Sequence, residues 1–487
     1  MAPRASAALT GLCLTAVCVL GTGLPASAAR PATALHSAAR IPAGLDTSAA
    51  RLWVSRYDGS GNSGDNAMAL GRSPDGTKVF VTGFSTGSTS GSNDVTVAYD
   101  ASTGAQVWAK RYNGPGNGDD YAVALGVSPD GTKVFVTGYS LGSTGNYDYA
   151  TVAYSASTGA QLWVKRYNGP GNGDDDAVAL AVSPDGTRVF VTGYSRGSTS
   201  GLDYATVAYG ASTGADQWVA RYNGPGNGND YAASALGVSP DGTKVFVTGQ
   251  SFGATGAYED ATVAYDASSG AHSWVTRYSG PGNTDNATGL GISPDGSKVF
   301  VTGYGLGSTS GFDYATIAYD VATGARLWVR HYNGPGNGND YAASTIGMTP
   351  DGTKVFVTGQ SAGPTGGSEY ATVAYGASTG AQLWVRRYKG PSSGSTVATA
   401  LGVSPDGSKV FVTGSTESSS RFAYATVTYD ALTGVQLWVK GYTGPGNGNN
   451  VATAIGVSPD GTKVFVTGHS LGSTGTYDYA TVAYKVT

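Results

Sequence analysis

Residues 128–138 read SPDGTKVFVTG, and this stretch and its close copies occur eight times at a spacing near 55 residues. The copies begin at Ser73, Ser128, Ser183, Ser239, Ser293, Thr349, Ser404 and Ser458. The eight tryptophans of the chain recur in step with them: Trp53, Trp108, Trp163, Trp218, Trp274, Trp328, Trp384 and Trp438. Self-similarity at a fixed period of this length is typical of propellers, solenoids and arrays.

One repeat contains four stretches with the pattern of short β-strands. In the second repeat these are residues 121–128, 133–139, 149–154 and 161–167. Pro129 presets φ and Gly131 accepts a positive φ, so a tight turn joins the first two stretches. Val, Thr and Tyr dominate the stretches, and 76 glycines in 487 residues disfavour long helices. Four antiparallel strands joined by short connections form one blade of a β-propeller.

The two ends of the repeat region complement each other. The last repeat supplies three strands, and residues 52–57 (LWVSRY) match the outer strand at residues 161–167 (QLWVKRY). We therefore predict an all-β fold, a single eight-bladed β-propeller over residues 51–487 with four-stranded antiparallel blades. Residues 52–57 would complete the last blade, which leaves no free sheet edge between the first and last blades. A seven-bladed ring with a spare repeat is the alternative.

The N-terminal region precedes the repeats. Residues 1–28 are typical of a secretory signal peptide, with Arg4 before an apolar stretch and Ala26-Ser27-Ala28 as the cleavage site. A membrane anchor is the competing interpretation, but the apolar run is short and is interrupted by Gly and Thr. Residues 29–50 are rich in Ala, Pro and Ser and are predicted to be a disordered leader. Both cysteines lie within residues 1–28, so the secreted chain would contain none.

The charge of the chain is small and dispersed. The net charge is −4, 13% of the residues are charged, and Lys and Arg recur singly rather than in clusters. This pattern argues against nucleic acid as a partner. We expect a secreted, extracellular monomer without a membrane span.

The order of the strands assigns the connections to two faces. The SPDG and STG turns share one face, and the longer GPGNG and GSTG loops share the other, which we call the long-loop face. Loops on a rigid scaffold commonly carry function, so we expect ligands there. The predicted ligand-binding residues follow Val-Thr-Gly in the second strand: Phe84, Tyr139, Tyr194, Gln250, Tyr304, Gln360 and His469. Neutral drift among duplicated repeats is the alternative explanation of their variation.

Acidic residues gather at the starts of the inner strands. Carboxylates with nearby Asn side chains and loop carbonyls are oxygen ligands that calcium prefers. The possible calcium ligands are Asp120, Asp175, Asp230, Asp285 and Asp340. A second acidic position precedes the third strand, at Asp148, Asp203, Asp260, Asp313, Glu369 and Asp478. The alternative is that each carboxylate accepts hydrogen bonds from loop amides, and the seventh repeat, which lacks both acids, favours that alternative.

Two further residue types have plain structural explanations. A ring of tryptophans could stack on sugars, but the same strand position in every repeat favours a structural role in packing between blades. The histidines, His36, His272, His331 and His469, do not converge, which argues against a His-based metal site or a catalytic triad. We predict no catalytic residues and no certain cofactor.

The repeat resembles known propeller families. The pattern RYNG…ALGVSPDG…VFVTG…DYATVAYD resembles the bacterial β-propeller repeat labelled SBBP, and its SPDG-x-x-VFVTG half resembles the YVTN repeat. Residues 153–163 (AYSASTGAQLW) resemble the tryptophan-docking motif of quinoprotein (PQQ-like) propellers, in which the Trp wedges between adjacent blades. The resemblance covers nearly all of residues 51–487. It implies a propeller, but the extra catalytic segments and vicinal cysteine pair of quinoprotein enzymes are missing from the repeats.

The sequence is compatible with three functions. The first is a secreted, non-catalytic binding or scaffold module for an extracellular polysaccharide or protein. The second is an extracellular enzyme that uses the centre of the ring, either lactonase-like or quinone-dependent. The third is a structural component of a surface or coat. Propellers host many unrelated activities, so the fold alone does not choose among them.

Overall fold

The structure is a computed structural model that describes residues 50–486, except 60–63, 88–90, 308–310, 392–393, 419–420 and 447. The chain divides into two units, residues 1–47 and 48–487, and every described residue lies in the second. The predicted signal peptide and nearly all of the predicted leader therefore lie outside the described residues. Among the described residues, no helix is long and apolar enough to cross a membrane.

The described residues form 32 strands in eight four-stranded sheets. The inner strands are β2 (Asp65–Arg72), β6 (Asp120–Val127), β10 (Asp175–Val182), β14 (Tyr231–Val238), β18 (Asp285–Ile292), β22 (Tyr341–Met348), β26 (Thr396–Val403) and β30 (Asn450–Val457). The second strands are β3 (Lys78–Thr86), β7 (Lys133–Leu141), β11 (Arg188–Arg196), β15 (Lys244–Phe252), β19 (Lys298–Leu306), β23 (Lys354–Ala362), β27 (Lys409–Ser418) and β31 (Lys463–Leu471). The third strands are β4 (Ser92–Asp100), β8 (Tyr147–Ser155), β12 (Leu202–Gly210), β16 (Tyr258–Asp266), β20 (Phe312–Asp320), β24 (Ser368–Gly376), β28 (Arg421–Asp430) and β32 (Tyr477–Lys485). The outer strands are β5 (Gln106–Tyr112), β9 (Gln161–Tyr167), β13 (Asp216–Tyr222), β17 (His272–Tyr278), β21 (Arg326–Tyr332), β25 (Gln382–Tyr388), β29 (Gln436–Tyr442) and β1 (Arg51–Tyr57).

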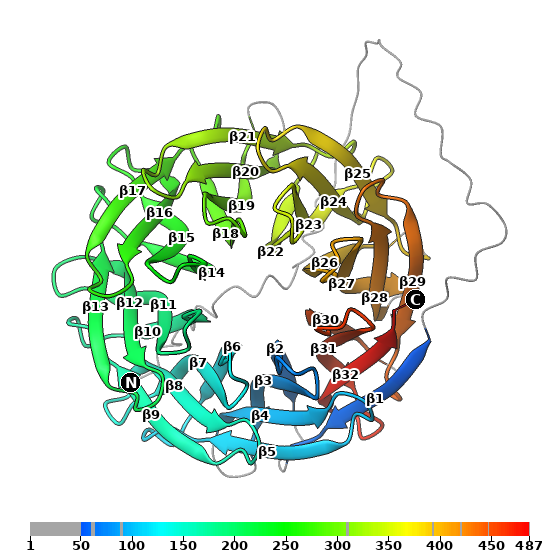
Figure 1. Cartoon of the computed structure of the whole chain (residues 1–487), viewed down its shortest axis with the longest axis horizontal. Coiled ribbons are helices and arrows are strands. Elements are labelled where there is room, and N and C mark those ends of the chain that lie inside the picture. Colours follow the sequence, from blue (N-terminus) through cyan, green and yellow to red (C-terminus); the bar gives the residue numbers. More distant parts are fainter. Residues whose placement is uncertain are drawn as a thin grey trace, which may run out of the picture. The chain divides into compact units, whose positions relative to one another are not determined.

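The eight sheets are arranged as blades around one axis, with the inner strands nearest the axis and the outer strands at the rim (Figure 1). Each inner strand contacts the inner strand of the next blade, and β2 contacts β30, so the ring closes after eight blades. The predicted eight-bladed propeller is confirmed, and the seven-bladed alternative is wrong. The second and third strands extend two residues further into the long loop than predicted in the second repeat, because Ser140 and Leu141 pair with Asp148 and Tyr147.

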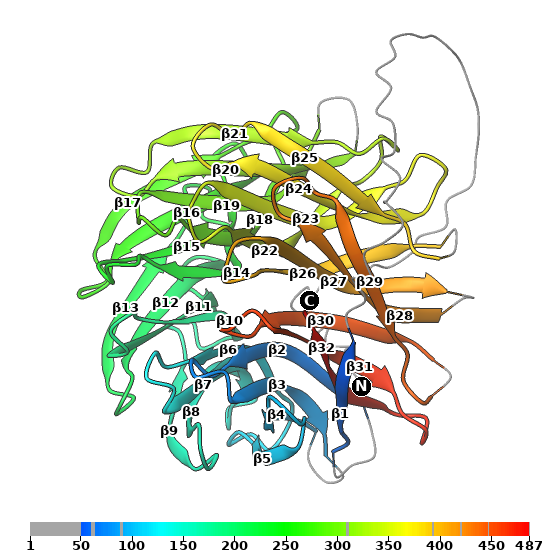
Figure 2. The same ribbon diagram turned by 45° about the vertical axis from the view of Figure 1, so that its right-hand side comes forward.

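The N-terminal strand completes the last blade, as the sequence predicts. β1 pairs antiparallel with β32, from Trp53 opposite Ala483 to Tyr57 opposite Tyr479. Figure 2 shows β1, in blue, beside the red strands of the C-terminal end. The sheet order β1-β32-β31-β30 therefore joins residues more than 400 positions apart in one blade.

Small residues allow the inner strands to crowd around the axis. A methyl group on Gly126 would lie 2.6 Å from the Leu180 side chain of the next blade, so only a small residue fits here, and the third repeat has Ala181 at the equivalent position. At the end of the same strand, Gly131 adopts φ of +70° in the SPDG turn and its amide donates to the carbonyl of Ser128. Pro129 of that turn contacts Gly186 in the turn of the next blade. The repeated motif thus serves both the hairpin and the contact between blades.

The tryptophans lie at the seams between blades. Trp163 packs between Phe135 of its own blade and Tyr209 of the next, with ring centroids 5.8 and 6.1 Å away. Its Nε1 donates to the carbonyl of Ala211, also in the next blade, at 3.1 Å. The same indole bond, at 3.0–3.3 Å, is made by Trp53, Trp108, Trp163, Trp218, Trp274, Trp328 and Trp384. Trp438 is equally buried, but its Nε1 has no hydrogen-bond partner in the described part of the chain.

Candidate functional site

The long-loop face carries a ring of variable residues. They lie where the inner strand of each blade begins and the second strand ends. We call these the mouth residues: the residue after Val-Thr-Gly in each second strand, and its cross-strand partner on the inner strand. The pairs are Asn66–Phe84, Tyr121–Tyr139, Asp176–Tyr194, Tyr231–Gln250, Asn286–Tyr304, Tyr341–Gln360, Val397–Ser415 and Val451–His469. All the predicted ligand-binding residues are among them.

The mouth residues form aromatic clusters that cross the seams between blades. Phe84 of the first blade packs edge-on against Tyr121 of the second, with centroids 4.9 Å apart, and Tyr121 contacts Tyr139 at 5.0 Å. In a second cluster the mouth residues Tyr194 and Tyr231 are joined by Tyr258 and Phe252 at the adjoining strand ends, and in a third Tyr304 and Tyr341 are joined by Phe312. The rings are half-buried. Each cluster is therefore a packed group with part of its surface open to a ligand.

Asp176 is the one carboxylate among the mouth residues. It lies between Tyr139 and Tyr194, and the Tyr194 hydroxyl donates a hydrogen bond to it. Burial raises the pKa of Asp176 to about 6, and the nearby Asp174 and Asp175 contribute to the rise. Burial and the charge of Asp176 raise the pKa values of both tyrosines in turn. The site therefore contains a carboxyl group that changes charge just below neutral pH.

The raised pKa of Asp176 predicts a pH-dependent stability. In the unfolded chain an Asp titrates near 3.8, so between about pH 4 and 6 only the folded state holds this proton, and the free energy of unfolding falls as the pH rises. Replacing Asp176→Asn removes the ionisation and keeps an acceptor for Tyr194. We expect the variant to match the natural protein at pH 4 and to exceed its free energy of unfolding by as much as about 3 kcal/mol at pH 7. Urea unfolding at both pH values measures the difference.

A matched variant at the exposed SPDG turn controls for the loss of a negative charge. The Ser73 hydroxyl, with the Thr77 amide, lowers the pKa of Asp75 to about 2. Asp75 therefore contributes stability that is lost only as the pH falls from about 4 to 2. Asp75→Asn should show a constant difference from the natural protein between pH 4 and 7. The same pH profile in both variants would refute the assignment of the raised pKa to Asp176.

The predicted calcium ligands lie one to a blade rather than together. Asp120 is fully buried and its Oδ2 accepts from the Gly114 amide at 2.9 Å. The equivalent bond, at 2.6 Å, holds the loop before Asp175, Asp230, Asp285 and Asp340. Each carboxylate thus fixes the long loop that precedes its inner strand. Calcium binding by these five residues stays a prediction.

The second acidic position forms ion pairs with arginines of the outer strands. Arg166 binds Asp148 at 2.9 Å and also donates to Ser140 Oγ and the Tyr112 hydroxyl of the preceding blade. Equivalent pairs join Arg56–Asp478, Arg221–Asp203, Arg277–Glu259 and Arg387–Glu369.

One assignment at this acidic position needs correction in the fourth blade. Glu259, not Asp260, takes the acidic position there, because Gln250 pairs with Asp260 as Tyr139 pairs with Tyr149. Asp260 therefore replaces a buried core tyrosine and is itself 2% exposed.

The three described histidines, His272, His331 and His469, stay apart, and His36 lies outside the described residues. His331 bonds the Tyr278 hydroxyl at 2.9 Å on the outer strands, and His272 packs against Tyr265. His469 is a mouth residue that packs edge-on against Tyr477, and burial lowers its pKa to about 4. His469 is therefore neutral at physiological pH.

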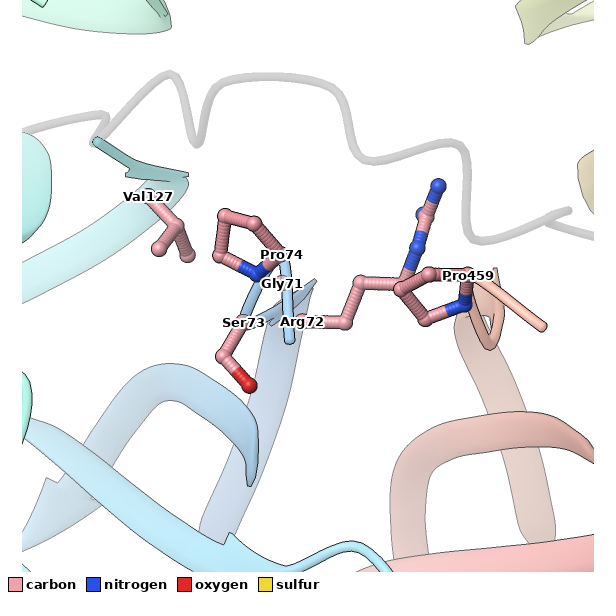
Figure 3. Close-up of a pocket in the computed structure, with 6 residues that line it drawn as sticks. All are labelled: Gly71, Arg72, Ser73, Pro74, Val127 and Pro459. Carbon is pink, nitrogen blue, oxygen red and sulfur yellow. The ribbon is translucent and has the colours of Figure 1, made fainter. Parts of the chain in front are cut away.

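The opposite face has a pocket of about 400 Å³ lined by Gly71, Arg72, Ser73, Pro74, Val127 and Pro459. Arg72 stands where the other inner strands end in Val, Ile or Met. Figure 3 shows its guanidinium pointing away from the strands, past Pro459. A single cation beside prolines is too little to specify a ligand, so the mouth residues remain the better candidate.

Comparison with known proteins supports the repeat type. The family model described as outer membrane protein assembly factor BamB, a PQQ-like repeat model, matches residues 43–206 and 203–367. The resemblance to PQQ-like repeats is thus confirmed, whereas that to SBBP and YVTN repeats stays a prediction. No curated protein matches the chain by sequence.

Several solved structures resemble the chain in fold. BamB from Moraxella catarrhalis has 14% identity and a TM-score of 0.51, covering 90% of this chain and 100% of its own. The quinohemoprotein alcohol dehydrogenase from Comamonas testosteroni has 13% identity and a TM-score of 0.54, covering 90% and 77%. Sqt1 from Chaetomium thermophilum, bound to the N-terminus of ribosomal protein L10, has 12% identity and a TM-score of 0.57, covering 87% and 98%. At these identities the likeness shows the fold alone.

Proposed function

Because the chain belongs to the PQQ-like β-propeller family described as outer membrane protein assembly factor BamB, we propose that it is a non-catalytic binding scaffold for extended polypeptide segments. The ligand would lie across the aromatic clusters of the long-loop face. The protein would act after export, because residues 1–28 have the pattern of a signal peptide.

The observation that carries this proposal is the set of aromatic clusters at the mouth. Three clusters lie on successive pairs of blades and expose part of each ring, which suits the apolar side chains of an extended peptide.

The polar groups nearby are largely engaged within the protein. Asn286 donates to the Tyr304 hydroxyl at 2.9 Å, and Tyr194 donates to Asp176. A polysaccharide would need such groups for its hydroxyls, so the balance favours a polypeptide.

The loops that frame the mouth are fixed between blades, which suits a preformed binding surface. Asp174 accepts the amide hydrogen of Tyr147 in the preceding blade at 3.0 Å. Asn229 does the same for Leu202. Because Asp and Asn perform this bond alike, the rim is held by hydrogen bonding rather than by charge. A rigid rim reduces the entropy that is lost when a ligand binds.

The test is binding of the purified protein to an array of 12-residue peptides that alternate aromatic and polar residues, followed by titration of the best peptide. The variant Tyr139→Ala removes the ring of the first cluster that packs against Tyr121. We expect its affinity for the peptide to fall about tenfold or more, since aromatic anchors dominate such interfaces. Its melting temperature, measured in parallel, shows whether the fold is intact.

A control variant and a competing ligand decide among the outcomes. Leu432→Ser removes an exposed apolar side chain on the opposite face and should leave peptide affinity unchanged. Equal affinities of the two variants would refute the long-loop face as the site. Binding of soluble xylan or cello-oligosaccharides, lost in Tyr139→Ala, without any peptide binding would replace the polypeptide with a glycan.

A further inference from the structure

Three carboxylates meet where the two ends of the propeller join. Asp58 follows β1, Asp65 begins β2, and Asp478 lies in β32, the partner of β1. One carboxylate oxygen from each residue lies within 4.8 Å of the other two. Among the described residues, this is the only group of three or more acidic, His or Cys side chains placed so closely.

The two buried members have oxygen atoms without hydrogen-bond donors. Asp65 and Asp478 are 0% and 6% exposed, and within the described part of the chain the Oδ1 atom of each has no hydrogen-bond partner. Their Oδ2 atoms are occupied: Asp65 accepts from the Gly59 amide at 2.7 Å, and Asp478 accepts from Arg56. A buried carboxylate oxygen without a donor is destabilising unless a cation or proton satisfies it. Burial, with the charges of Asp58 and Asp478, raises the pKa of Asp65 to about 6.

Other seams share the unpartnered oxygen, as at Asp148 Oδ1, and differ from the closing seam in the third carboxylate. Between the second and third blades, Asp148 and Asp175 correspond to Asp478 and Asp65, and Arg166 corresponds to Arg56. The third position there is Asn168, whose amide donates to the Asn172 side chain. The three seams from the second to the fifth blade thus each set one arginine against two carboxylates. The closing seam sets one arginine against three, and the added carboxylate is the exposed Asp58, through which an ion could enter.

We propose that Asp58, Asp65 and Asp478 bind one calcium ion that joins the N-terminal strand and the first inner strand to the last blade. Ca²⁺ takes oxygen ligands at about 2.3–2.6 Å, so three oxygens within 4.8 Å can share one ion. Carboxylates from three separate segments suit the irregular coordination of Ca²⁺ better than the strict octahedron of Mg²⁺. The ion would contact both chain ends of the closing blade, and this role is independent of any ligand at the mouth.

The test compares the natural protein with Asp58→Asn, which gives the closing seam the residue found at ordinary seams. Isothermal titration with CaCl₂ of the chelator-treated protein gives the number of bound ions. We expect the variant to bind one ion fewer and to lose a calcium-dependent rise of several degrees in melting temperature. Because Asn is natural at this position in other repeats, the variant should fold, and its melting temperature in EDTA checks this.

A second variant tests whether a third carboxylate is enough to create a calcium site at another seam. Asn168→Asp places the third carboxylate beside Asp148 and Asp175 and should add one calcium ion to the titration. Three results would each overturn the proposal: no calcium binding by the natural protein at 5 mM, an equal number of ions in the natural protein and Asp58→Asn, or an equal response to MgCl₂.

Discussion

A chain that begins at Asp58, without β1, is expected to lose its cooperative unfolding transition and to aggregate. The deletion exposes the whole edge of β32 and removes Trp53, which packs between Phe465 and Tyr99. Loss of a buried tryptophan alone costs about 3–5 kcal/mol. The deletion also leaves Asp478 buried without Arg56, at a cost of about 3–5 kcal/mol. Together these approach the total stability of about 5–15 kcal/mol that a typical protein has.

A circular permutant shows whether the ring needs the β1 strand itself or needs it at the N-terminus of the chain. Residues 50–59 are moved to follow Val486 through Ser-Thr-Gly, the residues that lie between Ala156 and Ala160 in the turn that joins β8 to β9, because Val486 and Ala50 hold the places of Ala156 and Ala160. All contacts of β1 are then restored, and the permutant should unfold cooperatively near the midpoint of the natural protein. Circular dichroism during urea unfolding measures both chains. A truncated chain with an unchanged midpoint would show that β1 contributes nothing to closing the ring.

The eight-bladed ring could be predicted from the sequence because the residues that form the blade and its contacts recur in all eight repeats. Gly126, Pro129 and Trp163 each lie against the next blade, so every copy carries both the blade and its seam. The match between residues 52–57 and the other outer strands identified the closing strand without any long-range information. Contacts repeated in register are therefore predictable even when they join distant residues.

The cross-strand partners of the mouth residues could not be predicted by counting residue pairs outward from the SPDG turn. Val127 pairs with Val134 beside the SPDG turn, and regular pairing from there would place Ala122 opposite Tyr139. A bulge between Ala122 and Ala124 shifts the register by one residue, so Tyr121 takes that place and builds the aromatic cluster. All eight inner strands are irregular near this point, by one residue in six blades and by two in the fourth and sixth, so comparing the repeats with one another does not locate the shift.

The carboxylate group at the closing seam was missed for a different reason. Asp58 occupies a position that is Asn in four of the eight repeats, and its partners Asp65 and Asp478 lie 413 positions apart. The predicted calcium ligands were chosen by recurrence, whereas this group depends on one substitution at one seam. Only the closed ring brings its members together.

Replacing Trp163→Ala is expected to lower the free energy of unfolding by about 3–5 kcal/mol, the usual loss for a buried aromatic residue. The indole fills the seam between Phe135 and Tyr209 and is covered by Gly214 in the turn of the next blade. Because each blade contacts only its neighbours, the cavity cannot be filled from elsewhere in the ring. Urea unfolding followed by circular dichroism measures the loss, and a loss below about 1 kcal/mol would contradict a packing role.

Comparing Trp163→Phe with Trp438→Phe measures how much the indole hydrogen bond contributes to the free energy of unfolding. Trp163 donates to Ala211 O at 3.1 Å, whereas Trp438 packs against Phe411 and Tyr484 at similar distances without a partner for its Nε1. Trp163→Phe leaves a buried carbonyl unpaired, and Trp438→Phe removes an atom that had no partner. We therefore expect Trp163→Phe to lose about 1 kcal/mol more than Trp438→Phe. Equal losses at the two seams would mean that packing, and not the hydrogen bond, decides the stability of the ring.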